Sequence, residues 1–298
     1  MHVYPSLRGR VVLVTGAGRG FGRLMSLALA EQGAQVLGTS ARNRAELDAT
    51  GAEVEAAARA AGRGGRFVGM LADVSREADC EATAARAIQE FGRIDALVNN
   101  AARGPTEADA NYYLALPKFW TAPPQAFRRM VETNLIGAFL MARAVVPGMI
   151  ERGFGRIVNL STSHPTMVMQ GLAAYGATKA GLEAATVMWA KDLAGTGVTA
   201  NVLLPGGPAD TALIGGTGVG TRAQAGFRAG KGPTGDEGRI GGILPAEVIV
   251  PPTLWLCADE SAAFNGRRIV GKDWDPEAPP EVALAKAMQP QGVAPRIM

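Results

Sequence analysis

The sequence predicts an α/β fold, a doubly wound parallel sheet of about seven strands with helices on both faces. Short β-branched or apolar runs alternate with longer Ala-rich segments along the chain, and strand–helix–strand repeats of this kind build parallel sheets. The short runs are also nearly continuously apolar, which is typical of strands that are buried on both sides.

The expected elements follow one another in regular order. Strands are expected at 11–14, 35–39, 66–71, 94–98, 156–160, 199–204 and 268–270. Helices are expected at about 21–32, 44–61, 76–91, 125–151, 174–194 and 246–258. No internal repeat and no linker interrupts this order, so residues 1–298 are expected to form a single domain. The stretch after Asp273 is rich in Pro, and an irregular C-terminal tail is expected there.

The composition excludes several classes of protein. Apolar residues make up 47% of the chain and charged residues 19%, which excludes a disordered chain. The net charge is 30 − 27 = +3 without any block of like charges, so no nucleic-acid partner is expected. Because the chain has no apolar run of about 18 residues and no long apolar start, neither a transmembrane helix nor a signal peptide is expected. No membrane partner is therefore expected either.

The few cysteines and histidines indicate a reducing environment and no metal. Cys80 and Cys257 lie far apart in the sequence and match no metal or redox spacing. This usage favours a reducing compartment, and we expect a cytoplasmic protein. His2 and His164 cannot complete a metal site with two remote cysteines, so no metal is expected.

A glycine loop follows the first expected strand and precedes the first expected helix. It is Thr15-Gly16-Ala17-Gly18-Arg19-Gly20-Phe21-Gly22, with the pattern G-x-x-x-G-x-G. Glycines let the backbone turn sharply and approach a pyrophosphate, which sits at the positive end of the helix. The candidate cofactor-binding residues are therefore Gly16, Gly18, Arg19, Gly20, Phe21 and Gly22. The domain is predicted to be a Rossmann-type dinucleotide-binding domain.

The residues after the second expected strand favour NADP over NAD. An NAD enzyme of this type usually places an acidic residue there to bond the adenosine ribose. The sequence has no acid between Glu31 and Glu46, whereas Arg42 follows the strand and Arg19 lies in the glycine loop. Two guanidinium groups suit a 2′-phosphate. The alternative is that both arginines are solvated surface groups.

A tyrosine and a lysine lie four residues apart on an expected helix. In Tyr175-Gly176-Ala177-Thr178-Lys179 both side chains fall on one helix face. A Tyr with a pKa of about 10 is a poor base at neutral pH, and a nearby ammonium lowers that pKa. Alone, this spacing also occurs by chance on exposed helices.

Taken together, the motifs resemble those of the short-chain dehydrogenase/reductase family from about Gly9 to Ile269. The motifs that carry the resemblance are Thr15 to Gly22, Asp73-Val74, Asn99-Asn100-Ala101, Asn134, the Ser/Thr cluster at 161–163, Tyr175 with Lys179, and Asn201 to Pro205-Gly206. Several motifs in family order are a much stronger signal than any one of them.

The resemblance implies the catalytic roles. Tyr175 would exchange a proton with the substrate oxygen, Lys179 would lower its pKa and bond the nicotinamide ribose, and Asn134 would hold a water in the proton relay. The family's substrate-polarising hydroxyl is usually a Ser 13 positions before the Tyr, which falls here on Thr162 (175 − 13 = 162). A shifted loop would instead present Ser161 or Ser163.

The resemblance also implies cofactor contacts. Asp73 and Val74 would contact the adenine, although Asp73 also suits a helix cap beside Ser75 and Glu77. The remaining implied contacts are Asn99 and Ala101 at the adenosine ribose, and Pro205, Gly206 and Thr211 at the nicotinamide.

Two segments are expected to shape substrate choice. One is about 103–124, with Tyr112, Tyr113, Phe119 and Trp120, which would contact a hydrophobic substrate or simply pack a long loop. The other is the Gly-rich segment at about 209–242, as in a mobile lid. The family resemblance further implies a homodimer or homotetramer assembled through the helices near 125–151 and 174–194.

The predicted function is NADP(H)-dependent hydride transfer between a nicotinamide and a secondary alcohol or carbonyl substrate. The alternative is a catalytically silent NADP-binding regulator of the same fold. Silent relatives would be expected to lose a proton-transfer residue, whereas Asn134, Tyr175 and Lys179 are all present. This favours the enzyme.

Overall fold

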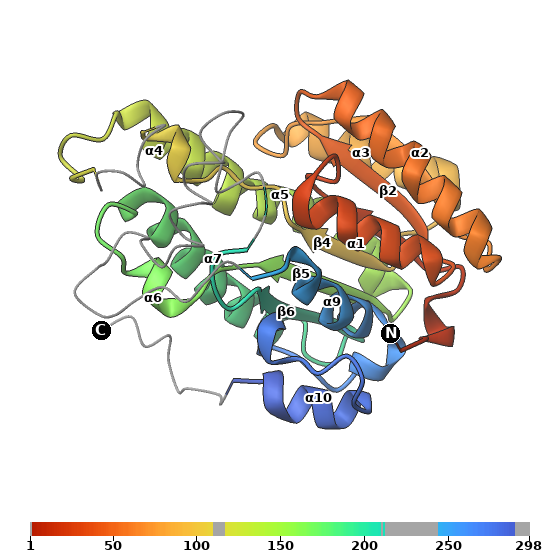
Figure 1. Cartoon of the computed structure of the whole chain (residues 1–298). Helices are drawn as coiled ribbons and strands as arrows, with labels where there is room; N and C mark the ends of the chain where they lie inside the picture. Colours follow the sequence, from red (N-terminus) through yellow and green to blue (C-terminus); the bar gives the residue numbers. More distant parts are fainter. Residues whose placement is uncertain (1, 110–116, 210, 212–243, 290–298) are drawn as a thin grey trace.

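A computed structural model describes residues 2–109, 117–209, 211 and 244–289. Its strands are β1 (Val11–Val14), β2 (Gln35–Ser40), β3 (Arg66–Leu71), β4 (Ala96–Asn99), β5 (Gly155–Leu160), β6 (Val198–Leu204) and β7 (Arg268–Val270). Its helices are α1 (Gly20–Glu31), α2 (Arg44–Ala61), α3 (Glu77–Phe91), α4 (Pro124–Val131), α5 (Gly137–Glu151), α6 (His164–Met167), α7 (Ala173–Asp192), α9 (Val250–Cys257) and α10 (Pro280–Ala287). Figure 1 shows the helices packed around a central sheet.

The seven strands form one parallel sheet in the order β3-β2-β1-β4-β5-β6-β7. The chain therefore builds outward from β1 to β3, returns to place β4 beside β1, and builds outward in the other direction. In such sheets ligands bind at the carboxyl ends of the strands where the order reverses, here between β1 and β4. The predicted doubly wound α/β fold is confirmed.

Strand side chains alternate between two layers of core. On β1, Val12 and Val14 join the core formed with α1, α2 and α9, whereas Leu13 joins the core formed with α3 and α5. Because the central strands β1, β4, β5 and β6 are covered on both sides, their apolar sequence is nearly continuous, whereas the edge strand β3 is partly exposed. The cysteines are free, and both Cys80 and Cys257 are buried.

Local signals explain why individual helices start and stop where they do. The α2 helix begins after Asn43, whose side chain accepts a hydrogen bond from the Glu46 amide at 3.0 Å, and it ends at Gly62 with φ +65°. An Asn cap at the start and a left-handed Gly at the end are the favoured terminators.

Two sequence-based expectations differ from the structure. The single helix expected at 125–151 is interrupted by a π-helical turn at Glu132–Ile136, between α4 and α5. The expectation of an irregular tail after Asp273 is wrong for 280–287, which form α10. Pro279 is the N-cap and Pro280 is the first helical residue, where a missing N–H breaks no hydrogen bond, and the helix buries Ala283 and Ala287. The short α6 was not predicted.

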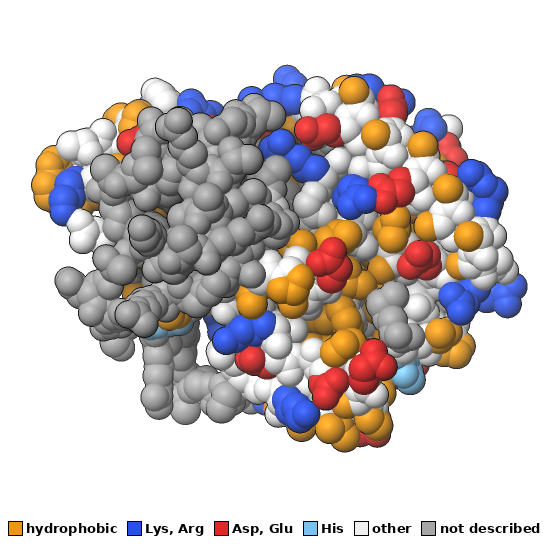
Figure 2. All heavy atoms as spheres, viewed as in Figure 1, with side chains coloured by type: hydrophobic (Ala, Val, Ile, Leu, Met, Phe, Trp, Pro, Cys, Tyr) orange, Lys and Arg blue, Asp and Glu red, His pale blue; other side chains and the backbone are white. Residues whose placement is uncertain are grey.

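The surface and one helix bear on possible partners. Figure 2 shows basic and acidic side chains interspersed on one face of the molecule, in keeping with the small net charge. Among the described helices, the run Pro124–Glu151 alone is long and apolar enough to cross a membrane, with a mean hydropathy of 1.4. Met141, Val145 and Met149 of this run lie in the core, so packing in the protein accounts for much of its apolar composition.

Candidate active site

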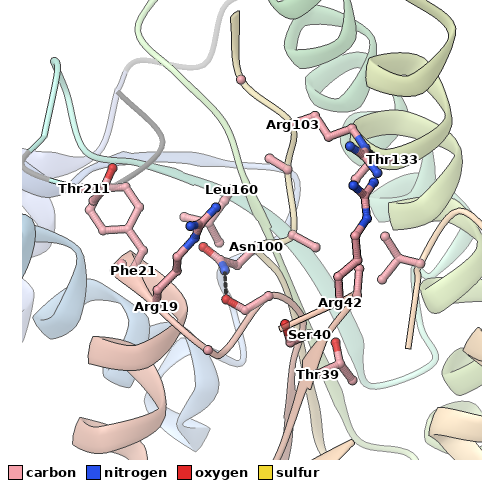
Figure 3. A pocket seen from close by; sticks show the side chains of 18 of the residues that line it. Arg19, Phe21, Thr39, Ser40, Arg42, Asn100, Arg103, Thr133, Leu160 and Thr211 are labelled. Atoms are coloured by element: carbon pink, nitrogen blue, oxygen red, sulfur yellow. Dashed lines mark hydrogen bonds between the residues drawn. The ribbon is translucent and has the colours of Figure 1, made fainter. Parts of the chain in front are cut away.

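A cleft of about 430 Å³ opens at the carboxyl edge of the sheet, where the strand order reverses. Its lining comes from the ends of β1, β2, β3, β4 and β5, from the π-helical turn and from α7. Residues from eight separate stretches of the described sequence thus meet around one space. Figure 3 shows ten of the lining side chains by name.

The glycine loop forms one wall of the cleft, and its glycines have different reasons to be glycine. Gly16 and Gly20 adopt φ +68° and +55°, a region that other residues rarely enter. Gly22 does not line the cleft. A Cβ on Gly22 would lie 2.1 Å from the Gly16 carbonyl oxygen, so only glycine lets α1 pack onto the loop. Gly18 and Phe21 line the cleft with ordinary backbone angles.

Thr15 and Asn100 hold this loop against the end of β4. Thr15 Oγ1 accepts hydrogen bonds from the Asn100 and Ala101 amides, each at 3.0 Å. Asn100 Nδ2 donates to the carbonyls of Thr15 at 2.8 Å and Gly16 at 3.1 Å (Figure 3). The two strand ends are therefore locked side by side.

The structure distinguishes the two neighbouring asparagines after β4. Asn99 was expected at the adenosine ribose, but its buried amide donates to the Ala138 carbonyl at 3.2 Å and to Asn159 Oδ1 at 2.9 Å. It thereby ties β4 to α5 and β5. Asn100, with Ala101, lines the cleft instead.

Three arginines and one aspartate line the cleft: Arg19, Arg42, Arg103 and Asp73. Arg19 is paired with Glu46 at 3.7 Å. Burial by itself would raise the pKa of Asp73, but hydrogen bonds from Ser75 and the charges of Arg103 and Arg42 hold it below its ordinary value. Asp73 is therefore an ionised acceptor that feels the charges of Arg42 and Arg103. It precedes α3 without capping it, since α3 begins at Glu77.

Tyr175 and Lys179 line the same cleft from α7. The Lys179 Nζ lies 5.9 Å from the centroid of the Tyr175 ring and donates to the Leu160 carbonyl at 2.7 Å. Burial lowers the pKa of Lys179 to about 8, and the nearby Glu183 carboxylate opposes that shift. An ammonium with this pKa is mostly protonated at neutral pH but sits close to its titration range.

The turn after β5 presents the candidate hydroxyls. Ser161 lines the cleft, and its buried Oγ has no hydrogen-bond partner within the described ranges. Thr162 is also buried but does not line the cleft, and its carbonyl accepts a hydrogen bond from Arg268. Ser163 Oγ bonds Thr166 Oγ1 at 2.8 Å, so this third hydroxyl already has a partner.

Asn134 lies in the π-helical turn, and its side-chain amide makes three hydrogen bonds within the protein. Its Oδ1 accepts from the Arg103 amide at 2.8 Å, and its Nδ2 donates to the Arg103 carbonyl at 3.0 Å and to Thr178 Oγ1 at 3.1 Å. Such π turns are frequent at functional sites. A relay water held by Asn134 would have to bond its remaining carbonyl lone pair or its main chain.

The remaining predicted positions divide between the cleft and other parts of the molecule. Val74 and Thr211 line it, whereas Pro205 and Gly206 do not. Gly206 has φ +98°, and a Cβ there would lie 2.6 Å from Val270 Cγ1. Most of the expected 209–242 lid, together with Tyr112 and Tyr113, lies outside the described residues. Phe119 and Trp120 project from the surface, with 71% and 69% of their areas exposed.

The lining fits a phosphate-bearing dinucleotide. Two of its lining residues, Thr39 and Ser161, carry buried hydroxyls that lack hydrogen-bond partners among the described residues. Buried polar groups are normally hydrogen-bonded, so both hydroxyls indicate a polar ligand. The α1 N-terminus, whose cap residue Arg19 makes no side-chain cap bond, offers free backbone amides to an anion. Within the described part of the chain, no group of three or more His, Cys, Asp or Glu residues is placed to hold a metal.

Comparison with known proteins identifies the family. The family model for short chain dehydrogenases matches residues 10–217. The chain belongs to the short-chain dehydrogenase/reductase family. It is 31% identical over 265 residues to a 3-oxoacyl-acyl-carrier-protein reductase of Escherichia coli, covering 89% of this chain and 96% of that protein. It is 32% identical over 268 residues to the D-threitol dehydrogenase of Mycolicibacterium smegmatis, covering 89% and 92%.

A solved structure agrees with this assignment. A short-chain type dehydrogenase/reductase from Mycobacterium marinum superposes with a TM-score of 0.73 at 25% identity, covering 89% of this chain and 94% of that one. As a short-chain dehydrogenase/reductase, the protein is an oxidoreductase acting on CH–OH or C=O groups, and its family binds NAD or NADP.

Several residues that line this short-chain dehydrogenase/reductase cleft were not predicted as site residues, among them Thr39, Asn100 and Arg103. Asn100 and Thr39 lie at strand ends that had been recognised, so their position on the sheet edge was the available signal. Arg103 carried no such signal, because only the fold brings it opposite Arg42 and Asp73.

Proposed function

We propose that this short-chain dehydrogenase/reductase transfers hydride between NADP(H) and a secondary alcohol or ketone, with Tyr175 as general acid/base. The juxtaposition of the glycine loop with Tyr175 and Lys179 in one cleft carries the proposal. The test is a panel of ketones and aldehydes with NADPH, followed by absorbance, and the matching alcohols with NADP. No turnover with any member in either direction would contradict it.

In this proposal the protein manages the proton and the position of the substrate. When bound, the nicotinamide supplies or accepts the hydride at the substrate carbon. In the reduction direction Tyr175 gives its phenolic proton to the substrate oxygen, and the Lys179 ammonium stabilises the phenolate that remains. A hydroxyl of the turn after β5 donates to the same oxygen and polarises the carbonyl before the proton moves.

The choice of NADP is supported by the basic wall of Arg19, Arg42 and Arg103. Arg42→Asp is expected to raise the Kd of NADPH about tenfold to a hundredfold, because a charge-assisted bond to the 2′-phosphate is lost and a repulsion is gained. Titration of the protein with NADPH and NADH measures both affinities. Arg44→Asp is the matched control. It changes the charge by the same amount, but Arg44 pairs with Asp48 on an exposed helix face. Equal effects of the two variants on NADPH would refute the assignment.

The hydroxyls of Thr162 and Ser161 are expected to have separable roles. Thr162 has the family spacing to Tyr175, so Thr162→Val should lower kcat about a hundredfold with little change in cofactor affinity. Ser161 lines the cleft itself, so Ser161→Ala should mainly weaken NADPH binding. Steady-state kinetics together with Kd measurements separate the two. A large kcat loss in Ser161→Ala alone would transfer the polarising role to Ser161.

The lowered pKa of Lys179 predicts a pH dependence. Reduction needs a protonated Tyr175 beside a charged Lys179, so the rate should fall as the pH rises through about 8, where Lys179 loses its proton. Lys179→Arg keeps the charge at alkaline pH, so the fall in rate should occur at a higher pH in this variant even if its maximum rate is lower. If the rate of Lys179→Arg falls over the same pH range as that of the wild type, another group causes the pH dependence.

We further propose that the protein assembles as a homodimer or homotetramer through α4, α5 and α7. Large apolar side chains remain exposed on these helices and on the π turn between them: Phe127, Ile136, Phe139, Ile150, Val187 and Met188. Since α4 and the π turn pack beside α7, these residues belong to neighbouring elements that a second copy would cover.

A further inference from the structure

Arg268, the first residue of β7, joins three segments that are far apart in the sequence. Its Nε donates to both carboxylate oxygens of Glu183 on α7, at 3.0 and 3.1 Å. Its Nη2 donates to the Thr162 carbonyl at 2.8 Å, and its Nη1 donates to Gln289 Oε1. Every guanidinium nitrogen thus has an acceptor.

Both members of the ion pair are largely buried. The side chains of Arg268 and Glu183 are 19% and 18% exposed. A planar guanidinium with donors in a fixed fork can hold acceptors in several directions at once, which an ammonium cannot do. The cluster is therefore a rigid junction and not a loose surface pair.

This junction completes the anchoring of the turn that carries the candidate hydroxyls. The Leu160 carbonyl is held by Lys179 Nζ at 2.7 Å, and the Ser161 amide donates to the Leu203 carbonyl at 2.8 Å. The Thr162 carbonyl is held by Arg268. Three successive residues of the turn are thus each fixed through their main chain.

Two of these anchors depend on side chains from the same face of α7. Tyr175, Lys179 and Glu183 follow one another at intervals of four residues on α7, so their side chains lie in a row along one side of the helix. Lys179 holds the turn directly, and Glu183 holds it through Arg268. The position of Thr162 relative to Tyr175 is thereby fixed from a single rigid element.

We propose that Arg268 is a positioning residue of the active site, which sets the Thr162 hydroxyl relative to Tyr175 through the Thr162 main chain and uses Glu183 as its anchor. The proposal rests on the proposed function, because it concerns the hydroxyl that polarises the substrate. Arg268 does not line the cleft, so it does not itself touch the cofactor or substrate there.

The first arm of the test measures the turn without any reaction. Hydrogen–deuterium exchange of peptides covering 159–167 is compared between the wild type and Arg268→Met, which keeps the stem of the side chain and removes its donors. Exchange in these peptides should become about tenfold faster, since a hydrogen bond to a charged group is lost. The matched control is the neighbouring Arg267→Met, whose main-chain amide bonds Asn201 and which should leave these peptides unchanged.

The second arm measures catalysis with NADPH and the best carbonyl compound from the panel. In Arg268→Met the kcat should fall about tenfold to a hundredfold, because small misplacements of a catalytic group have effects of that size, while the Kd of NADPH stays within about twofold. Glu183→Ala should show the same split, and the double variant should be no worse than either single one. Arg268→Lys keeps the charge but not the fork and should fail to restore kcat.

The outcomes separate the two proposals. Faster exchange with a selective kcat loss in Arg268→Met and Glu183→Ala supports the positioning role. Unchanged exchange, an equal kcat loss in Arg267→Met, a matching rise in the Kd of NADPH, or full activity in Arg268→Lys overturns it. If Arg268→Met does not fold, Glu183→Ala and Arg268→Lys decide by the same readouts. If the wild type reduces no carbonyl, the proposed function fails and the exchange arm alone decides whether Arg268 fixes the turn.

Discussion

Tyr175→Phe is expected to lower kcat for carbonyl reduction by about a hundredfold to ten-thousandfold, the range that general acid–base groups contribute. The variant removes one oxygen from a side chain that lines the cleft beside Lys179 and is otherwise packed against Ala126 and Met130. Because the ring and its packing remain, the Kd of NADPH and the melting temperature should change little. Single-turnover reduction under saturating NADPH measures the chemical step.

Tyr4→Phe provides the control for this experiment. Tyr4 is buried near the N-terminus, and its amide bonds Gln32, far from the cleft lining. Removing its phenolic oxygen tests whether loss of any buried hydroxyl lowers the rate. A kcat for Tyr175→Phe within about threefold of the wild type would remove the general-acid assignment.

Gly22→Ala is expected to abolish cofactor binding at accessible concentrations and to destabilise the fold. The new Cβ would stand 2.1 Å from the Gly16 carbonyl oxygen and 2.7 Å from Asn100 Nδ2, so the glycine loop and α1 must separate. Overpacking of a well-filled site costs about 1–3 kcal/mol, and here the obstructing atoms are backbone that cannot rotate away. Thermal unfolding and NADPH titration measure the two effects.

Gly148→Ala serves as the comparison for Gly22→Ala. Gly148 also lies inside a helix, but among the described residues its Cβ would meet only the far end of the Arg152 side chain, at 3.2 Å, and no backbone atom outside its own helix. Alanine in a helix is favoured over glycine by about 1 kcal/mol, so this variant should be neutral or stabilised. If Gly22→Ala has the same thermal stability and NADPH affinity as Gly148→Ala, the glycine loop can accommodate a Cβ at position 22, and the steric argument fails.

Most strands were predictable because a strand buried on both faces is a short, nearly continuous apolar run, and the partly exposed edge strand β3 keeps a run of the same kind. The runs 11–14, 66–71 and 268–270 match β1, β3 and β7 residue for residue, since each consists mainly of apolar or β-branched residues. The π turn at Glu132–Ile136 left no such mark, because one extra residue in a helix does not alter its apolar spacing enough to be seen. The α10 helix was missed for a different reason. Prolines are common both in loops and at the first position of a helix, so the Pro-rich tail did not distinguish the two.

The site was predictable where chemistry is carried by motifs and unpredictable where it depends on side-chain direction. The glycine loop and the Tyr175–Lys179 pair reach one cleft as expected. Which of Asn99 and Asn100 faces that cleft depends on alternation along the strand end, which spacing alone does not set. Arg103 and Arg268 act across distances of 30 and 106 residues to Thr133 and Thr162, and only the folded sheet creates those contacts.

The cleft draws its walls from both halves of the polypeptide, with the glycine loop before Asn134 and the Tyr175–Lys179 pair after it. A nucleotide bound there would connect regions that lie far apart in the sequence. Mass action then makes saturation with ligand raise the resistance of the entire sheet to unfolding. A proteolytic fragment ending before β5 would keep the glycine loop but lose this reinforcement, since it lacks the opposite wall.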